Sequence, residues 1–194
     1  METAQKTRFT EYEYLALEQA SRTRHEFVDG QIVAMAGGSP RHSLIALNVA
    51  AVLRAALRDR PCVVLGSDLA VHIAAAGAYV YPDVTVVCGE VELGPKRPAG
   101  VRNPVLVVEV LSRSTRGYDL GDKFDLFRRL PSLVDFLAVR QHERLVQHFH
   151  RTDVGRWLVV EVEGDGVVEL GAMGIALPLR EIYEKIELFP EEEE

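Results

Sequence analysis

Two carboxylates have the spacing that metal-assisted hydrolysis requires. Asp83 follows Pro82 at the start of the strand-like run VTVVC, and Glu109 lies inside VLVVEVL, the most hydrophobic run in the chain. If these runs form an antiparallel hairpin in which Cys88 pairs with Pro104, Asp83 lies opposite Glu109, with the two Cβ atoms about 5 Å apart. Both carboxylates could then bind one hard cation such as Mg²⁺.

Lys123 is the third group of this hypothesis. In the run LGDKFDLF, a helix with Leu120, Phe124 and Phe127 on its inward stripe also places Lys123 on that stripe. Such a lysine either extends its ammonium to water past packed methylenes or meets the two carboxylates. In the second case the group has what phosphodiester hydrolysis needs. A cation polarises the phosphate and activates a water, and the lysine orients that water or stabilises developing charge.

The same residues, and the histidines, have simpler interpretations. Pro-Asp is also an ordinary strand start, because proline is tolerated at the first residue of a strand. Glu26, beside the predicted Asp29-Gly30 turn, fits an exposed carboxylate, and His42 fits a surface or capping position in the first turn of a helix. His148 and His150 share one face of a strand, but without a third ligand nearby we expect them to be exposed.

The first elements that must position these residues have clear boundaries. Thr10 and Glu13 form a capping-box pattern that predicts a helix ending near Ala20. Asp29-Gly30, between HEFV and QIVAM, predicts a type I′ hairpin turn because both positions accept positive φ.

A longer helix and a series of strands follow. Ser39 is the expected N-cap, with Pro40 at the first helical position, and the helix runs to about Arg58. Its predicted inward residues are Leu44, Leu47, Ala51 and Ala55. A second helix is predicted over about 120–129, and a late hairpin turns through 153–155. The strand-like runs are CVVL, LAVHI, VTVVC, VLVVEVL, VDFLAV, LVQHFH and WLVVEV. This order predicts an α/β or α+β fold with a mixed central sheet, flanking helices and hairpins at both ends.

Length and composition limit the class of protein. The chain has 194 residues, of which 47% are hydrophobic and 26% charged. We therefore expect one domain over 1–190 and a disordered acidic tail over 191–194. The net charge of -7 argues weakly against nucleic acid, but four of these charges belong to the tail, so charge does not decide the question.

Cysteine usage and apolar runs bear on the compartment. Cys62 and Cys88 each lie in an apolar run, and we expect them to be buried free thiols, as suits a reducing cytosol. No stretch of about 18 apolar residues is present, and the first residues lack the pattern of a signal peptide. These observations predict a cytoplasmic protein without membrane contact.

A family resemblance extends through most of the chain, from about Thr10 to Phe189. It is carried by RHEFVDGQIV, YPDVTVVCG, NPVLVVEVLSRSTRGYDLGDKFDLFRRLPSLVDFLAV and the closing hairpin. These runs resemble the Uma family of bacterial proteins, placed in the restriction-endonuclease-like PD-(D/E)XK superfamily. PD-(D/E)XK alone is a weak pattern, but the upstream Pro-Asp together with EVLS-x-ST is specific. The resemblance implies a restriction-endonuclease-like fold and an endonuclease that uses Mg²⁺, or Mn²⁺ in its place, to hydrolyse nucleic acid, with DNA as the expected substrate.

The resemblance also implies a role for each matching residue. Asp83 matches the aspartate of the motif and Glu109 its strand acid, so both are implied Mg²⁺ ligands, with the backbone carbonyl of Val110 as a third. Glu26 matches a further catalytic acid that binds the metal or a water. His42 matches an accessory histidine of the family.

The lysine departs from the superfamily pattern. The third motif position is Leu111 here, and Lys123 on the following helix takes the matching catalytic role. If Lys123 does not reach the acids, metal would still bind but hydrolysis would be slow or absent.

Two hypotheses from different classes follow. The first is a Mg²⁺-dependent endonuclease, expected to be a homodimer because C₂ symmetry presents two sites to the two strands of a duplex. The second is a catalytically inactive binding or assembly module that keeps the nuclease fold, in which the acids and Lys123 form a structural ion-pair cluster. Metal binding distinguishes the two.

Overall fold

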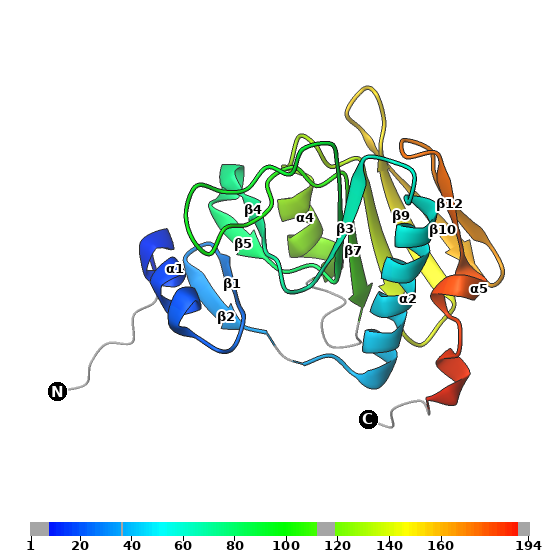
Figure 1. The fold of residues 1–194 in the computed structure, drawn as a ribbon, viewed down its shortest axis with the longest axis horizontal. Coiled ribbons are helices and arrows are strands. Elements are labelled where there is room, and N and C mark those ends of the chain that lie inside the picture. The colour runs from blue at the N-terminus through cyan, green and yellow to red at the C-terminus, as the bar shows by residue number, and fades with distance from the viewer. Residues whose placement is uncertain (1–7, 36, 112–118, 190–194) are drawn as a thin grey trace.

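The chain forms a mixed α+β fold around a central β-sheet (Figure 1). A computed structural model describes residues 8–35, 37–111 and 119–189. The predicted acidic tail, 191–194, lies outside the described residues. The fold class predicted from the sequence is confirmed, with the mixed sheet at the centre and hairpins near both ends of the described chain. None of the helices in the described ranges has the length and apolar character needed to cross a bilayer.

The central sheet has the strand order β10-β9-β8-β7-β6-β3. Its interior strand β7 runs parallel to β8 and antiparallel to β6, which makes the sheet mixed. Every residue of β7 is buried, as expected for a strand covered on both faces. The bounds of the strands are Cys62–Gly66 for β3, Val84–Cys88 for β6, Leu106–Leu111 for β7, Asp135–Arg140 for β8, Leu145–Arg151 for β9 and Trp157–Glu163 for β10.

The register of β6 against β7 is the one that the sequence hypothesis assumed. Val84 pairs with Val108, and Val86 pairs with Leu106. Continued by one residue, this register sets Asp83, just before β6, opposite Glu109. The strand pair therefore places the two predicted acids side by side at one end of β6.

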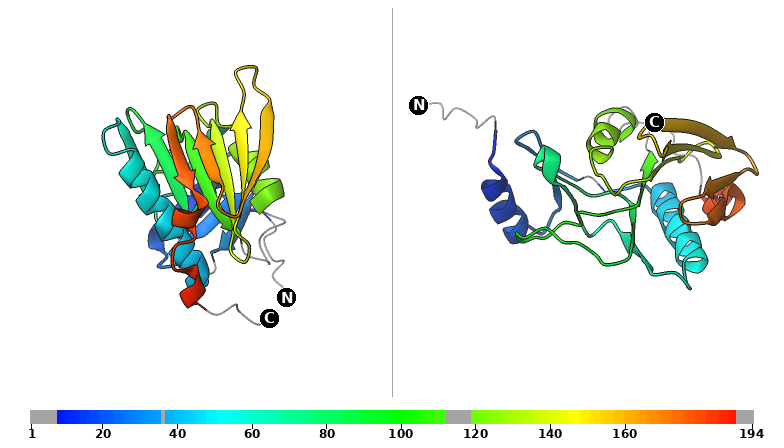
Figure 2. Two further views of the ribbon diagram at one scale, coloured as in Figure 1. Left: turned by 90° about the vertical axis from the view of Figure 1, so that its right-hand side faces the viewer. Right: turned by 90° about the horizontal axis from the view of Figure 1, so that it is seen from above.

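Two hydrophobic cores cover opposite faces of the central sheet. In Figure 2, α2 and α4 lie on opposite sides of it. One core contains residues of α2, α5, β11 and β12, and the other contains residues of α4, β4 and β5. Alternate residues of β7 enter alternate cores, and Glu109 has the same parity as Val107 and Leu111, which face α4. The bounds are Pro40–Ala56 for α2, Phe124–Phe127 for α4, Leu179–Ile182 for α5, Val71–Ile73 for β4, Ala78–Val80 for β5, Val167–Leu170 for β11 and Ile175–Pro178 for β12.

A second sheet, of order β2-β1-β5-β4, lies beside α1 (Figure 1). The capping box of α1 (Glu11–Ala20) is confirmed, since Thr10 Oγ1 accepts from Glu13 N–H and Thr10 N–H donates to Glu13 Oε2. The hairpin of β1 (His25–Val28) and β2 (Gln31–Ala34) is also confirmed. Asp29 and Gly30 have φ of 49° and 78°, as a type I′ turn requires. Short 3₁₀ turns are η1 (Ala74–Ala76) and η3 (Ile186–Leu188).

The start of α2 is as predicted, but its inward face is not. Ser39 caps the helix by accepting from His42 N–H, and Pro40 is its first residue. The buried apolar residues are Ile45, Val49 and Leu53, whereas the predicted Leu47 is 66% exposed. Alanine and larger apolar residues occur on most sides of this helix. The apolar periodicity is therefore compatible with several inward faces. The face with the larger branched side chains removes more apolar surface from water and is the one that packs.

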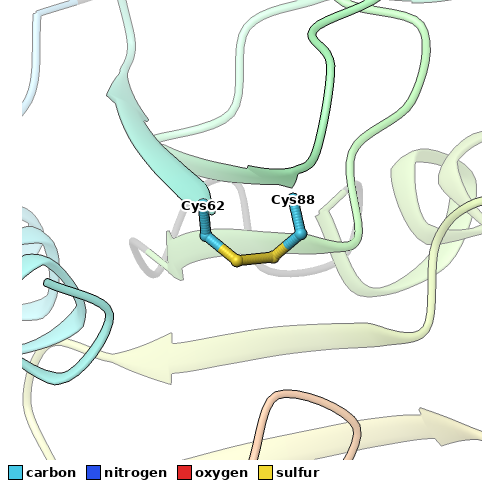
Figure 3. The surroundings of a disulfide bond; sticks show 2 residues. All are labelled: Cys62 and Cys88. Carbon is cyan, nitrogen blue, oxygen red and sulfur yellow. A yellow bond between two sulfur atoms is a disulfide. The ribbon is translucent and has the colours of Figure 1, made fainter. Parts of the chain in front are cut away.

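The two cysteines form a disulfide, which corrects the prediction of free thiols (Figure 3). Cys62 and Cys88 are directly paired residues on the neighbouring antiparallel strands β3 and β6. Directly opposed residues in such a ladder are close enough for their sulfurs to bond. Each cysteine lies in its own apolar run, and the local pattern of neither run indicates that the two strands pair. Because disulfides persist mainly in oxidising environments, this bond gives no support to a reducing compartment.

Candidate active site

Lys123 links two of the predicted acids. Its Nζ atom lies 3.0 Å from Glu109 Oε1 and 3.0 Å from Glu26 Oε1. The side chains of all three residues are at most 10% exposed. The ammonium is thus buried between carboxylates from β7 and β1 rather than extended to water, and the lysine supplied by the later helix does reach the strand glutamate.

The local helix geometry directs Lys123 inward. The helix predicted over about 120–129 is instead a π-helical turn, η2 (Asp119–Lys123), followed by the short helix α4. Phe124 and Phe127 are buried in the core on the α4 side of the sheet, as predicted, and the ring of Phe124 packs against that of Phe136. Lys123 is the last residue of the π turn. Such turns occur frequently at functional sites.

Glu26 belongs to the same cluster and is not an exposed carboxylate. It lies in β1 and is 7% exposed. Besides its contact with Lys123, Glu26 Oε1 accepts a hydrogen bond from the backbone N–H of Tyr81 at 3.1 Å. Tyr81 is itself fixed, because its hydroxyl donates to Glu18 Oε1 at 2.8 Å, and burial, together with this bond, raises the pKa of Tyr81 to about 12. Glu26 is therefore held toward Lys123 by the segment that leads to Asp83.

Asp83 is held by the neighbouring strand and by α2. Its Oδ2 atom accepts from the backbone N–H of Val110 at 2.7 Å and lies 3.2 Å from His42 Nε2. The sequence resemblance implied the Val110 carbonyl as a ligand, and the contact in the structure is made by the amide of the same residue. His42 reaches Asp83 because the Ser39 cap fixes the first turn of α2. The structure thus brings all four predicted side-chain acids and bases, and the accessory histidine, to one end of β6 and β7.

The donor atoms of this cluster suit a hard cation. Asp83, Glu109 and Glu26 offer carboxylate oxygens, the ligands that Mg²⁺ prefers, beside the Lys123 ammonium. Among the described residues, these acids do not supply three side-chain ligand atoms within 4.8 Å of one another. A metal here would therefore complete its shell with backbone oxygen, water or substrate, as Mg²⁺ commonly does.

One predicted pair of exposed histidines belongs to a different cluster. His148 is 7% exposed, and Asp135, which the sequence interpretation did not consider, lies within hydrogen-bonding distance of both His148 and His150. The sequence signal for this cluster lies in the strand runs VDFLAV and LVQHFH, which contain its three residues. Pairing them as a hairpin sets Asp135 opposite His150.

A solved structure shares this fold. The fold resembles the crystal structure of a protein described as a "putative nuclease belonging to DUF820" from Anabaena variabilis, with a TM-score of 0.74 over 92% of this chain and 99% of that chain. The sequences are 13% identical, so this likeness concerns the fold alone.

The family follows from the sequence. The family model Uma2, described as "Putative restriction endonuclease", matches residues 11–180. Two proteins of Synechocystis, both described as uncharacterized, are similar over most of their length. One, slr1290, is 37% identical over 88% of this chain and 89% of its own, and the other, sll1609, is 33% identical over 86% and 94%. The chain belongs to the Uma2 family, and the resemblance stated from its motifs is confirmed.

Proposed function

We propose that this protein is a Mg²⁺-dependent endonuclease that hydrolyses phosphodiester bonds in DNA. The observation that supports this most directly is the position of Lys123, 3.0 Å from both Glu109 and Glu26. A lysine that comes from a helix after the strand, and still meets the strand acid, restores the acid and lysine pair that Leu111 interrupts in the sequence. Mn²⁺ is expected to substitute for Mg²⁺.

Each residue has a distinct role in this proposal. Asp83 and Glu109 would hold the cation, with Val110 contributing its carbonyl oxygen. When bound, the metal would polarise the scissile phosphate and lower the pKa of a water. Lys123 orients the attacking water and stabilises the charge that develops on the phosphate.

Two further residues act around this centre. Glu26 holds the lysine ammonium in place from the opposite side and offers a carboxylate to a water. His42 orients Asp83 through their 3.2 Å contact.

The proposal extends to partner and compartment. The family description supports nucleic acid as the substrate class. DNA is the specific substrate proposed, and cutting both of its strands with one site per chain favours a homodimer. A nuclease must reach the compartment that contains its DNA, so a cytoplasmic location is part of the proposal. The Cys62–Cys88 disulfide is the feature that opposes it.

The buried ion pair also supports the second function, a binding or assembly module. Lys123 with Glu109 and Glu26 is the ion-pair cluster that such a module would contain. In that case the cluster only fixes the position of α4 on the sheet, and no metal binds.

Plasmid cleavage tests the proposal. The wild-type protein is incubated with supercoiled plasmid and Mg²⁺ or Mn²⁺, beside the nearly isosteric variants Asp83→Asn, Glu109→Gln and Lys123→Met. Cleavage is expected to fall by about 100-fold or more in each variant, since removal of one charge-stabilising group typically has this effect. Calorimetric titration with Mg²⁺ should show binding to the wild type that is lost in Asp83→Asn and Glu109→Gln.

Matched controls test the effect of removing a charge outside the candidate site. Glu169 is an exposed strand glutamate, and Lys96 is an exposed lysine, so Glu169→Gln and Lys96→Met should cleave like the wild type. Wild-type protein that neither cuts plasmid nor binds Mg²⁺ would favour the binding module. Cleavage that persists in all three site variants would come from a contaminant or another site and would also reject the proposal.

A further inference from the structure

A second cluster of side chains that could bind a metal lies on the other face of the central sheet. Asp135 is the first residue of β8 and pairs with His150 of β9, while His148, two residues earlier, points to the same side. Asp135 Oδ1 lies 2.7 Å from His148 Nε2 and 2.8 Å from His150 Nδ1. Among the described residues, this is the group of three whose ligand atoms all lie within 4.8 Å of one another.

This group is separate from the proposed nuclease site. Asp135 pairs with Leu106 of β7, whose side chain enters the core on the α2 side, whereas Glu109 has the parity of residues that face α4. The two groups are thus on opposite faces and three residues apart along the strand direction. No residue of one contributes to the other.

The burial of the Asp135 carboxyl group is the central observation. Its side chain is 0% exposed, and among the described residues its Oδ2 atom has no hydrogen-bond partner. An ionised carboxylate buried in this way is unfavourable unless a cation or several donors compensate it. Both imidazoles contact the same oxygen atom, Oδ1, and neither hydrogen-bonds Oδ2. A divalent cation would compensate a charge on this carboxylate and could bind the two imidazole nitrogens that already lie beside it.

The ligand types select the kind of cation. We propose that Asp135, His148 and His150 form a binding site for a divalent transition metal such as Zn²⁺. Two imidazole nitrogens and one carboxylate oxygen suit Zn²⁺ and its neighbours, whereas Mg²⁺ and Ca²⁺ prefer oxygen alone. Ligands at about 2.1 Å from a tetrahedral Zn²⁺ lie about 3.4 Å apart. The two contacts of Oδ1, at 2.7 and 2.8 Å, therefore lengthen by about 0.6 to 0.7 Å on binding, which side-chain rotation can provide.

Access to the site is from the side of His150. The His150 side chain is 36% exposed, compared with 9% for that of His148. The metal can enter there, and a fourth position remains open to water. His150 is also the ligand whose removal disturbs the core least, so it is the residue to change first.

Zinc titration of the full chain, without a polyhistidine tag, tests the site. The protein is treated with EDTA, dialysed, and titrated with Zn²⁺ by calorimetry in excess Mg²⁺, which occupies oxygen-only sites. We expect one Zn²⁺ per chain and a rise in melting temperature with Zn²⁺, because a ligand that binds the folded state stabilises it. His150→Ala, and likewise Asp135→Asn and His148→Ala, should weaken binding by at least about 10- to 100-fold, the typical effect of removing even an outer-shell partner of a metal ligand.

The control is His142→Ala, which removes a histidine outside the group and should bind Zn²⁺ like the wild type. Circular dichroism of each variant shows whether it is folded. If Asp135→Asn or His148→Ala does not fold, the partly exposed His150 still decides the question. Absence of Zn²⁺ binding in the wild type overturns the proposal, as does unchanged affinity in folded His150→Ala, which would place the metal elsewhere.

Discussion

Lys123 comes from a turn outside the central sheet, yet its ammonium lies 3.0 Å from a carboxylate oxygen of Glu109 on the interior strand β7. The same nitrogen is 3.0 Å from Glu26 on a different sheet. One side chain therefore joins α4, the central sheet and the β1 hairpin at the candidate active site. This arrangement makes the lysine important for stability as well as for the proposed chemistry.

Removal of Lys123 is expected to destabilise the fold. Lys123→Met removes the ammonium that lies between the buried Glu109 and Glu26, and breaking a buried pair in this way lowers the free energy of unfolding by about 3 to 5 kcal/mol. The double variant Lys123→Met/Glu109→Gln should lose clearly less than the sum of the two single variants, because each already removes the same interaction. Urea unfolding at pH 7 measures all three. Additive losses would mean that the two groups do not interact as the structure shows.

Part of the geometry of this candidate site could be predicted from the sequence, for physical reasons. The assumed pairing of Cys88 with Pro104 sets Asp83 opposite Glu109, and the observed register of β6 against β7 agrees with it. A slip of one residue would have turned the two side chains to opposite faces, so this agreement rests on the assumed register. The inward direction of Lys123 followed from its spacing to Phe124 and Phe127, although the π turn itself left no sequence signal.

Other features depend on which elements meet, and this was not predictable from local patterns. The disulfide requires β3 to pair with β6, and the group of Asp135 requires β8 to be read against β9. The inward face of α2 also depends on its neighbours, because the apolar period of that helix fits more than one face.

The observed inward face of α2 predicts effects of different size for two nearby residues, Ile45 and Leu47. Ile45 is fully buried against the central sheet, whereas Leu47, two residues later, is 66% exposed. Ile45→Ala should lower the free energy of unfolding by about 2 to 5 kcal/mol, the usual effect of truncating a large core side chain. Leu47→Ala should change it by no more than about 0.5 kcal/mol, as for most surface positions. Chemical unfolding of both variants checks this, and equal losses would contradict the observed face.

The disulfide predicts a dependence on redox conditions. Cys62 and Cys88 are 26 residues apart in the chain, and a crosslink that closes a loop of this length stabilises by about 3 to 4 kcal/mol in the chain-entropy treatment. Reduction of the wild type should therefore lower its melting temperature. The double variant Cys62→Ala/Cys88→Ala should melt near the reduced wild type and should not respond to reductant. Thermal unfolding with and without dithiothreitol measures this. A wild type that is insensitive to reductant, with thiols that react freely before reduction, would show that the bond does not form.

Burial of His72 predicts loss of stability in acid. His72 in β4 is 8% exposed, its ring stacks on Tyr79 at 4.3 Å, and burial lowers its pKa below the ordinary value of 6.5. The unfolded chain then binds a proton at a pH where the folded chain does not, so the free energy of unfolding falls as the pH drops below about 6.5. This loss of unfolding free energy is absent above that pH, and it stops increasing once His72 of the folded chain is also protonated.

The variant His72→Phe should make this dependence shallower, because phenylalanine retains the stacking on Tyr79 and does not titrate. The measurement is urea unfolding of wild type and variant at pH 7.5 and pH 5.5, with His142→Phe as a control for loss of a histidine elsewhere. The wild type should lose more stability between the two pH values than His72→Phe does, and His142→Phe should resemble the wild type. If wild type and His72→Phe lose the same amount, His72 is protonated as easily in the folded chain as in the unfolded one, and its burial does not carry the acid sensitivity.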